Sequence, residues 1–207
     1  MIYLKKFELK KPYREIKPFK MEFQDGMNLI VGENGSGKST VLQLIVEGKK
    51  SEHSIVDIDS VSYMFFDTEK HNPRTRNYLP EKGGMFQVAS HFWSHGQTLF
   101  PILEHIKEIS NQLVLIDEPE SGISLSNQIK LLEAMGTAMK NNCQIVLATH
   151  SYVFIRSAEK VFNLSTKRWV KSKTYLKSVL GDLAFMENST KATTVATAAA
   201  FSLRDKK

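Results

Sequence analysis

Gly32-Glu33-Asn34-Gly35-Ser36-Gly37-Lys38-Ser39-Thr40 directly follows the short apolar run Met27–Val31. The stretch matches the spacing of a glycine, four residues and then Gly-Lys-Ser/Thr, and a predicted helix over 38–47 continues it. Glycines let backbone amides turn toward an anion, and the positive end of the helix points at the same place. The sequence therefore predicts a strand, a phosphate-binding loop and a helix that together hold a nucleoside triphosphate.

The side chains within this loop have distinct predicted roles. The ammonium of Lys38 reaches the β- and γ-phosphates, and the hydroxyl of Ser39 holds Mg²⁺. The other predicted nucleotide contacts in the loop are Gly32, Asn34, Gly35, Ser36, Gly37 and Thr40.

The chain's 207 residues suit one globular domain with a full core. We expect that domain over residues 1–180, followed by a basic, Ala/Thr-rich tail over 181–207. No apolar run has the length of a membrane span, and the single cysteine, Cys143, fits a reducing compartment. A cytoplasmic protein that does not contact a membrane is the expectation.

The net charge of +6 is unevenly distributed. Residues 1–20 carry seven basic and two acidic side chains (+5), residues 21–159 eleven and seventeen (−6), and residues 160–207 ten and three (+7). Basic ends of this kind either attract nucleic acid or are solvated lysines on exposed edges. Both interpretations stay open at this point.

Strand and helix patterns alternate along the chain. Ile2–Leu9 and Phe19–Phe23 alternate apolar and polar residues, as half-buried strands do. Short, fully apolar runs are typical of the inner strands of a parallel sheet. The remaining predicted strands are 61–66, 113–116, 144–148, 161–164 and 168–170, and the remaining predicted helices lie over 97–109 and 124–140. This order predicts an α/β fold with a mostly parallel central sheet flanked by helices.

Two carboxylates follow the apolar run Leu113–Ile116. The carboxyl end of a buried parallel strand faces the ligand crevice of an α/β sheet. Asp117 can therefore bind Mg²⁺ together with Ser39, and Glu118 can act as the general base for an attacking water. Solvated acids at a strand end are the alternative.

A histidine follows the next apolar run, Gln144–Ala148. In the sequence Thr149-His150-Ser151, the imidazole of His150 can hydrogen-bond the γ-phosphate or the attacking water. A structural histidine at a strand end is the alternative, and the order of phosphate loop, acidic strand and strand-histidine favours function.

Taken in order, these motifs resemble the ABC-type ATPase head. The fourth motif of that family is Ser-x-Gly-Gln/Glu, and Ser94-His95-Gly96-Gln97 supplies it. The resemblance implies a P-loop NTPase fold with an N-terminal antiparallel β portion, ATP and Mg²⁺ as ligands, and catalysis by Glu118, His150 and Lys38. It also implies a homodimer that forms on ATP, with Ser94, Gly96 and Gln97 of one copy binding the nucleotide of the other.

The chain departs from transporter heads, because Ser94 follows Lys38 by only 56 residues (94 − 38). No glutamine occupies the usual switch position, where Asp67-Thr68-Glu69 stands. The run Phe65-Phe66-Asp67-Thr68-Glu69-Lys70-His71-Asn72-Pro73-Arg74 is similar to that of compact AAA-type heads of bacteria and phages, near the repair and chromosome-maintenance heads and the overcoming-lysogenization-defect proteins. The expected function is a soluble ATPase that drives or gates an effector or nucleic-acid-related partner. The alternative is an ATP-operated switch with little turnover that gates a nuclease or toxin.

Overall fold

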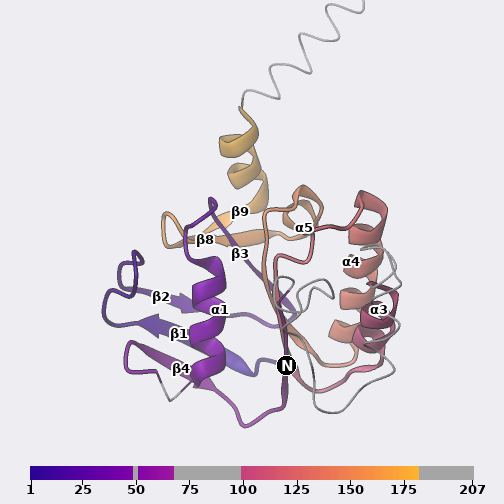
Figure 1. The fold of residues 1–207 in the computed structure, drawn as a ribbon, viewed down its shortest axis with the longest axis horizontal. Coiled ribbons are helices and arrows are strands. Elements are labelled where there is room, and N and C mark those ends of the chain that lie inside the picture. The colour runs from indigo at the N-terminus through magenta and orange to yellow at the C-terminus, as the bar shows by residue number, and fades with distance from the viewer. Residues whose placement is uncertain (49–50, 68–98, 182–207) are drawn as a thin grey trace, which may run out of the picture.

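The computed structural model describes residues 1–48, 51–67 and 99–181 (Figure 1). Strands and helices alternate through most of this length. The strands are β1 (Leu4–Leu9), β2 (Phe19–Glu22), β3 (Met27–Val31), β4 (Ser54–Ile58), β5 (Tyr63–Asp67), β6 (Leu113–Asp117), β7 (Gln144–Ala148), β8 (Lys160–Asn163) and β9 (Arg168–Lys171). The helices are α1 (Lys38–Glu47), α3 (Leu99–Glu108), α4 (Leu125–Lys140), α5 (Tyr152–Ser157) and one over 172–181.

Two sheets form the framework. A three-stranded antiparallel sheet has the order β2-β1-β4, and a six-stranded sheet has the order β5-β6-β7-β3-β8-β9. All neighbours in the larger sheet are parallel except β8 and β9, which form an antiparallel pair at its edge. The predicted mostly parallel sheet and the antiparallel N-terminal portion are both confirmed.

The larger sheet is buried on both faces, since alternate residues of each inner strand enter different cores. On one face, side chains such as Ile30 and Val146 pack against α1 and the small sheet. On the other, side chains such as Leu29 and Ile145 pack against α3, α4 and α5. Figure 1 shows the same layering, with α1 beside β1, β2 and β4 and with α3 and α4 on the opposite side. Two covered faces explain why β6 and β7 are apolar without interruption.

The small sheet is joined to the larger one by a buried side chain. Gln144, fully buried at the start of β7, accepts hydrogen bonds from the amides of Tyr3 and Leu4 at 3.0 and 2.7 Å. Its amide group donates to the carbonyl oxygens of Leu4 and Gln24 at 3.0 and 2.9 Å. The amide satisfies backbone groups that have no partner of their own at this junction.

Most predicted elements are confirmed, and α1 has the predicted bounds. Three were missed: β4, α5 and the helix over 172–181. β4 is a short strand held by pairing with β1, and α5 is a six-residue helix that Ser151 caps. Within the described residues, no helix is both long and apolar enough to cross a membrane. The predicted tail lies outside the described residues, apart from residue 181.

Candidate nucleotide site

The phosphate loop connects β3 to α1 through glycines in the left-handed region of backbone space. Gly35 and Gly37 have φ values of 77° and 95°, which disfavour any side chain. A Cβ on Gly32 would come within 2.8 Å of Ser36 Oγ, and one on Gly37 would collide with the side chain of Ile16. The loop therefore needs glycine both for its own turn and for contact with its surroundings. Helix α1 begins directly after it, at Lys38.

The Lys38 ammonium lies inside the loop rather than in solvent. The residue is 3% exposed, and Nζ donates to the carbonyl oxygens of Gly32 and Glu33 at 3.3 and 3.2 Å. Burial lowers the pKa of Lys38, while the carboxylates of Glu118, Asp117 and Glu120 oppose that shift. A buried cation held among backbone carbonyls is a ready partner for an anion that enters the loop.

Glu118 and His150 converge on this cation from two neighbouring strands. Parallel pairing of β6 with β7 places Asp117 beside Ala148, so the chain leaves both strands at the same edge of the sheet. Lys38 Nζ lies 2.6 Å from His150 Nε2 and 3.5 Å from Glu118 Oε1. His150 Nε2 is 3.1 Å from the same carboxylate oxygen. The three residues predicted to be catalytic are thus in mutual contact.

Glu118 has an unusual backbone, with a φ of 44°. Its amide donates to the carbonyl oxygen of Ala148 at 2.9 Å, next to the last pair of β6 and β7, Asp117 and Ala148. The left-handed turn directs the chain away from the strand, and strain of this kind occurs most often at functional sites.

Ser39 and Asp117 form the predicted metal pair. Ser39 lies in the first turn of α1, which packs against β6, and Asp117 is the last residue of β6 and is 5% exposed. A hydroxyl and a carboxylate are hard oxygen donors, which suit Mg²⁺. In the part of the chain that the structure describes, no group of three or more His, Cys, Asp or Glu side chains could enclose a metal.

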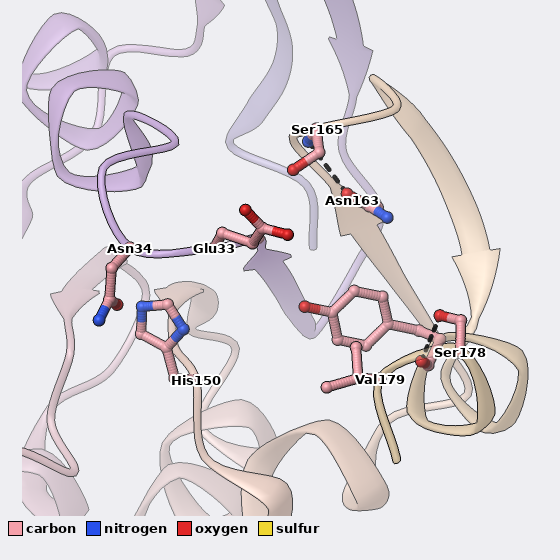
Figure 2. Close-up of a pocket in the computed structure, with 9 residues that line it drawn as sticks. Glu33, Asn34, His150, Asn163, Ser165, Ser178 and Val179 are labelled. Atoms are coloured by element: carbon pink, nitrogen blue, oxygen red, sulfur yellow. Dashed lines mark hydrogen bonds between the residues drawn. The ribbon is translucent and has the colours of Figure 1, made fainter. Parts of the chain in front are cut away.

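A pocket of about 790 Å³ opens beside the loop. Figure 2 shows Glu33, Asn34 and His150 on one side and Ser178 and Val179, on the helix over 172–181, on the other. Tyr175 also lines it, and burial, together with the charge of Glu33, raises the pKa of its phenol. The pocket is thus lined by Gly32, Glu33 and Asn34 of the phosphate loop and by His150.

A tight turn covers the other end of the loop. The amides and carbonyls of Tyr13 and Ile16 exchange two hydrogen bonds, at 3.1 and 3.0 Å. Arg14 Nη1 donates to Thr40 Oγ1 at 3.2 Å, and its guanidinium lies 5.6 Å from the ring of Tyr13. Phe19, which follows this turn, is 8% exposed and belongs to the core.

Several predicted residues have no described position. Ser94, Gly96 and Gln97 lie outside the described residues, and their roles remain predictions. Thr68 and Glu69, at the usual switch position, also lie outside the described residues. Asp67 is described only as the last residue of β5, in register with Asp117.

Glu120 is a site residue that sequence reasoning missed. Its Oε1 accepts hydrogen bonds from Thr149 Oγ1 and from the amides of His150 and Ser151. A third carboxylate two residues after Glu118 was the only sequence signal for it.

Comparison with known proteins agrees with this geometry. The family model "AAA ATPase domain" matches residues 3–78, and the model "AAA domain, putative AbiEii toxin, Type IV TA system" matches residues 79–156. A solved structure entitled "Structure of ATP binding subunit of ABC transporter" is 17% identical, with a TM-score of 0.52. The similarity covers 86% of this chain and 93% of that one. No curated protein matches the chain.

The phosphate loop, the acidic strand end and the strand-end histidine define a P-loop nucleotide-binding protein. Residues 3–78 and 79–156 match models of AAA ATPase domains, and the fold is similar to that of an ABC transporter's ATP-binding subunit.

Proposed function

We propose that this chain hydrolyses Mg-ATP, and that two copies close on the nucleotide to do so. The observation that carries the proposal is the convergence of Lys38, Glu118 and His150 on the phosphate loop, at 2.6 to 3.5 Å from one another. A cation, a carboxylate and an imidazole are the groups that charge neutralisation, water activation and γ-phosphate recognition require.

Each residue has one task in this proposal. Lys38 exchanges its contacts with Gly32, Glu33 and His150 for oxygens of the β- and γ-phosphates. His150 donates a hydrogen bond to the γ-phosphate, and Glu118 accepts a proton from the attacking water. Ser39 and Asp117 would hold Mg²⁺, which supplies charge neutralisation at the phosphates.

The second copy is proposed to bring Ser94, Gly96 and Gln97 to the γ-phosphate. The open pocket at the histidine end of the loop supports an approach from that side. Three large apolar side chains on α4 and α5 are also exposed, namely Leu125 at 64%, Ile129 at 46% and Tyr152 at 55%, and a dimer interface at this position would cover them.

Substitution Glu118→Gln tests this proposal. It removes the base and keeps the shape, so we expect turnover to fall by about 100-fold or more while Mg-ATP still binds. Light scattering after size exclusion should detect a dimer with Mg-ATP and a monomer with Mg-ADP. Glu133→Gln, on the exposed face of α4, is the matched control and should behave as wild type. A Glu118→Gln protein that stays monomeric in saturating Mg-ATP would contradict the dimer.

An alternative is that ATP acts mainly as a switch that gates an effector. The description of the second matching family, which names a putative toxin of a type IV toxin–antitoxin system, supports an effector partner. Tight ATP binding by the purified wild type, with turnover too slow to measure, would favour this alternative over hydrolysis.

Nucleic acid is a second candidate partner, favoured by one specific surface. Residues 160–181 carry six basic side chains and no acidic one, on β8, β9 and the helix over 172–181. Most of them are exposed, and Lys167 also donates to the carbonyl oxygen of Lys17, which adds another cation from the N-terminal segment. A basic segment without acidic side chains suits a phosphate backbone.

A further inference from the structure

Glu120 joins two segments that are 30 residues apart in the sequence. It lies in the turn after β6, and its Oε1 accepts from Thr149 Oγ1 at 2.8 Å and from the amide of Ser151 at 3.1 Å. The same oxygen accepts from the amide of His150. One carboxylate oxygen of Glu120 therefore accepts three hydrogen bonds from residues 149–151.

The β-ladder supplies no partner for these donors because β7 ends at Ala148. The amide of His150 lies at an exposed residue, and the amide of Ser151 also donates to Thr149 Oγ1 at 2.9 Å. Thr149 is fully buried, so its hydroxyl needs an acceptor, and a charged acceptor makes the strongest hydrogen bonds. A second contact supports the same segment, since Ser151 Oγ donates to Gln128 Oε1 on α4 at 2.6 Å.

The turn that carries Glu120 is itself held in place. The amide of Ser121 donates to the carbonyl oxygen of Glu118 at 3.1 Å, and the amide of Ile123 donates to that of Glu120 at 3.2 Å. Pro119, between the two glutamates, is buried. The Glu120 carboxylate is therefore presented by a turn with few alternative conformations.

His150 is the residue on which this arrangement acts. Glu120 holds its backbone amide, while its Nε2 lies 2.6 Å from Lys38 Nζ on the other side. Fixing the amide fixes the Cα, and thereby how far the imidazole reaches over the phosphate loop. Supporting hydrogen bonds of this type commonly set the position of a functional side chain.

We propose that Glu120 is a positioning residue that sets His150 at the γ-phosphate. This inference rests on the proposed function, in which His150 binds that phosphate. In this proposal Glu120 contacts neither the nucleotide nor the attacking water, and it positions His150 through its hydrogen bonds to residues 149–151.

The test combines four variants: Glu120→Ala, Glu120→Gln, His150→Ala and the double variant Glu120→Ala/His150→Ala. The first readout is residue-resolved amide exchange of the nucleotide-free protein, where Glu120→Ala should speed exchange at His150 and Ser151 by about tenfold or more. The second is steady-state turnover with Mg-ATP, where a misplaced histidine should lower kcat by about 10- to 100-fold. Affinity for Mg-ADP, which lacks the γ-phosphate, should change less than about twofold.

The conservative variant and the double variant separate positioning from a general structural role. Glu120→Gln keeps the accepting oxygen, and its new amide group replaces Oε2, for which the described residues provide no hydrogen bond. It should retain turnover within about threefold of wild type. The double variant should be no slower than His150→Ala alone, because Glu120 then has no histidine to position.

Any one of three results would overturn the role of Glu120 without affecting the proposed function. They are unchanged amide exchange in Glu120→Ala, unchanged kcat in Glu120→Ala, and a loss of kcat in the double variant that equals the product of the two single losses. If Glu120→Ala does not fold, Glu120→Asp, which withdraws the carboxylate by one methylene, takes its place in both measurements. If wild type binds ATP without turnover, the γ-phosphate readout becomes the ratio of ATP to ADP affinity, which Glu120→Ala should lower. A wild type that binds no ATP would overturn the proposed function and this inference together.

Discussion

The side chain of Ile16 packs directly on the bare backbone of Gly37, with no room for a Cβ between them. Gly37 is the N-cap of α1, and Ile16 belongs to the tight turn that begins at Tyr13. The phosphate loop is therefore held from outside by an N-terminal turn as well as by its own glycines. Arg14, in the same turn, adds the hydrogen bond to Thr40.

Substitution Gly37→Ala should destabilise the protein and abolish nucleotide binding. The added methyl group must displace the side chain of Ile16, and the alanine must adopt the backbone φ of 95° found at residue 37. We therefore expect a loss of about 2–4 kcal/mol in the free energy of unfolding. Chemical denaturation and ATP titration measure the two effects. Gly136→Ala is the matched control, because nothing lies within 4 Å of a Cβ at that position of α4. It should gain about 0.5–1 kcal/mol, and a comparable loss in both variants would contradict the explanation.

Gln144→Leu should be strongly destabilising although the site is far from the nucleotide. It leaves the amides of Tyr3 and Leu4 and the carbonyl oxygens of Leu4 and Gln24 without their partner. We expect a loss of about 3 kcal/mol or more. Gln43→Leu, at a half-buried position of α1, is the control and should change stability by less than about 1 kcal/mol. Thermal unfolding of the two variants checks the difference, and equal stability would show that the small sheet does not depend on Gln144.

Tyr175 should give the protein a stability component that is lost in alkali. Burial, with the charge of Glu33, raises its pKa above the ordinary value of 10.0. As pH rises, the unfolded chain therefore loses the phenol proton before the folded protein does. The contribution is complete below 10.0 and disappears as pH passes the folded-state pKa.

We expect the unfolding free energy of wild type, relative to Tyr175→Phe, to fall as pH rises above 10.0. In addition, Glu33→Gln should bring the tyrosinate absorbance of Tyr175 to lower pH. Tyr63→Phe, at a residue that is 50% exposed, controls for the other tyrosines. If the unfolding free energy of wild type, relative to Tyr175→Phe, instead rose with pH, the raised pKa of Tyr175 would be contradicted.

Binding to nucleic acid, if it involves the basic surface, should weaken when charges on the helix over 172–181 are reversed. Lys173 and Lys177 are exposed and four residues apart, so they lie on one face of that helix. For duplex DNA, each of Lys173→Glu and Lys177→Glu should reduce the slope of log affinity against log salt by about 0.9. Fluorescence anisotropy at several salt concentrations measures this. Lys140→Glu, at the exposed end of α4, is the control because it makes the same charge change elsewhere. Equal effects from all three variants would show that binding depends on net charge and not on this basic surface.

Local sequence was sufficient for much of the fold. The bounds of α1 followed from the glycine-rich turn before it, and β6 and β7 followed from uninterrupted apolar runs. β4 and α5 were missed because a five-residue strand and a six-residue helix carry little periodicity of their own. Their stability comes from pairing with β1 and from packing of Phe154 and Ile155 in the core.

The sequence alone determined that the chain binds a nucleoside triphosphate, because left-handed glycines followed by Lys38 and a helix form an anion site by local geometry. It also supplied Asp117, Glu118 and His150 as candidates. Only the tertiary structure decided that Lys38 meets His150, 112 residues away, and that Glu120 holds the backbone of that histidine. These contacts depend on which strands are neighbours and in what register, and no spacing along the chain specifies that.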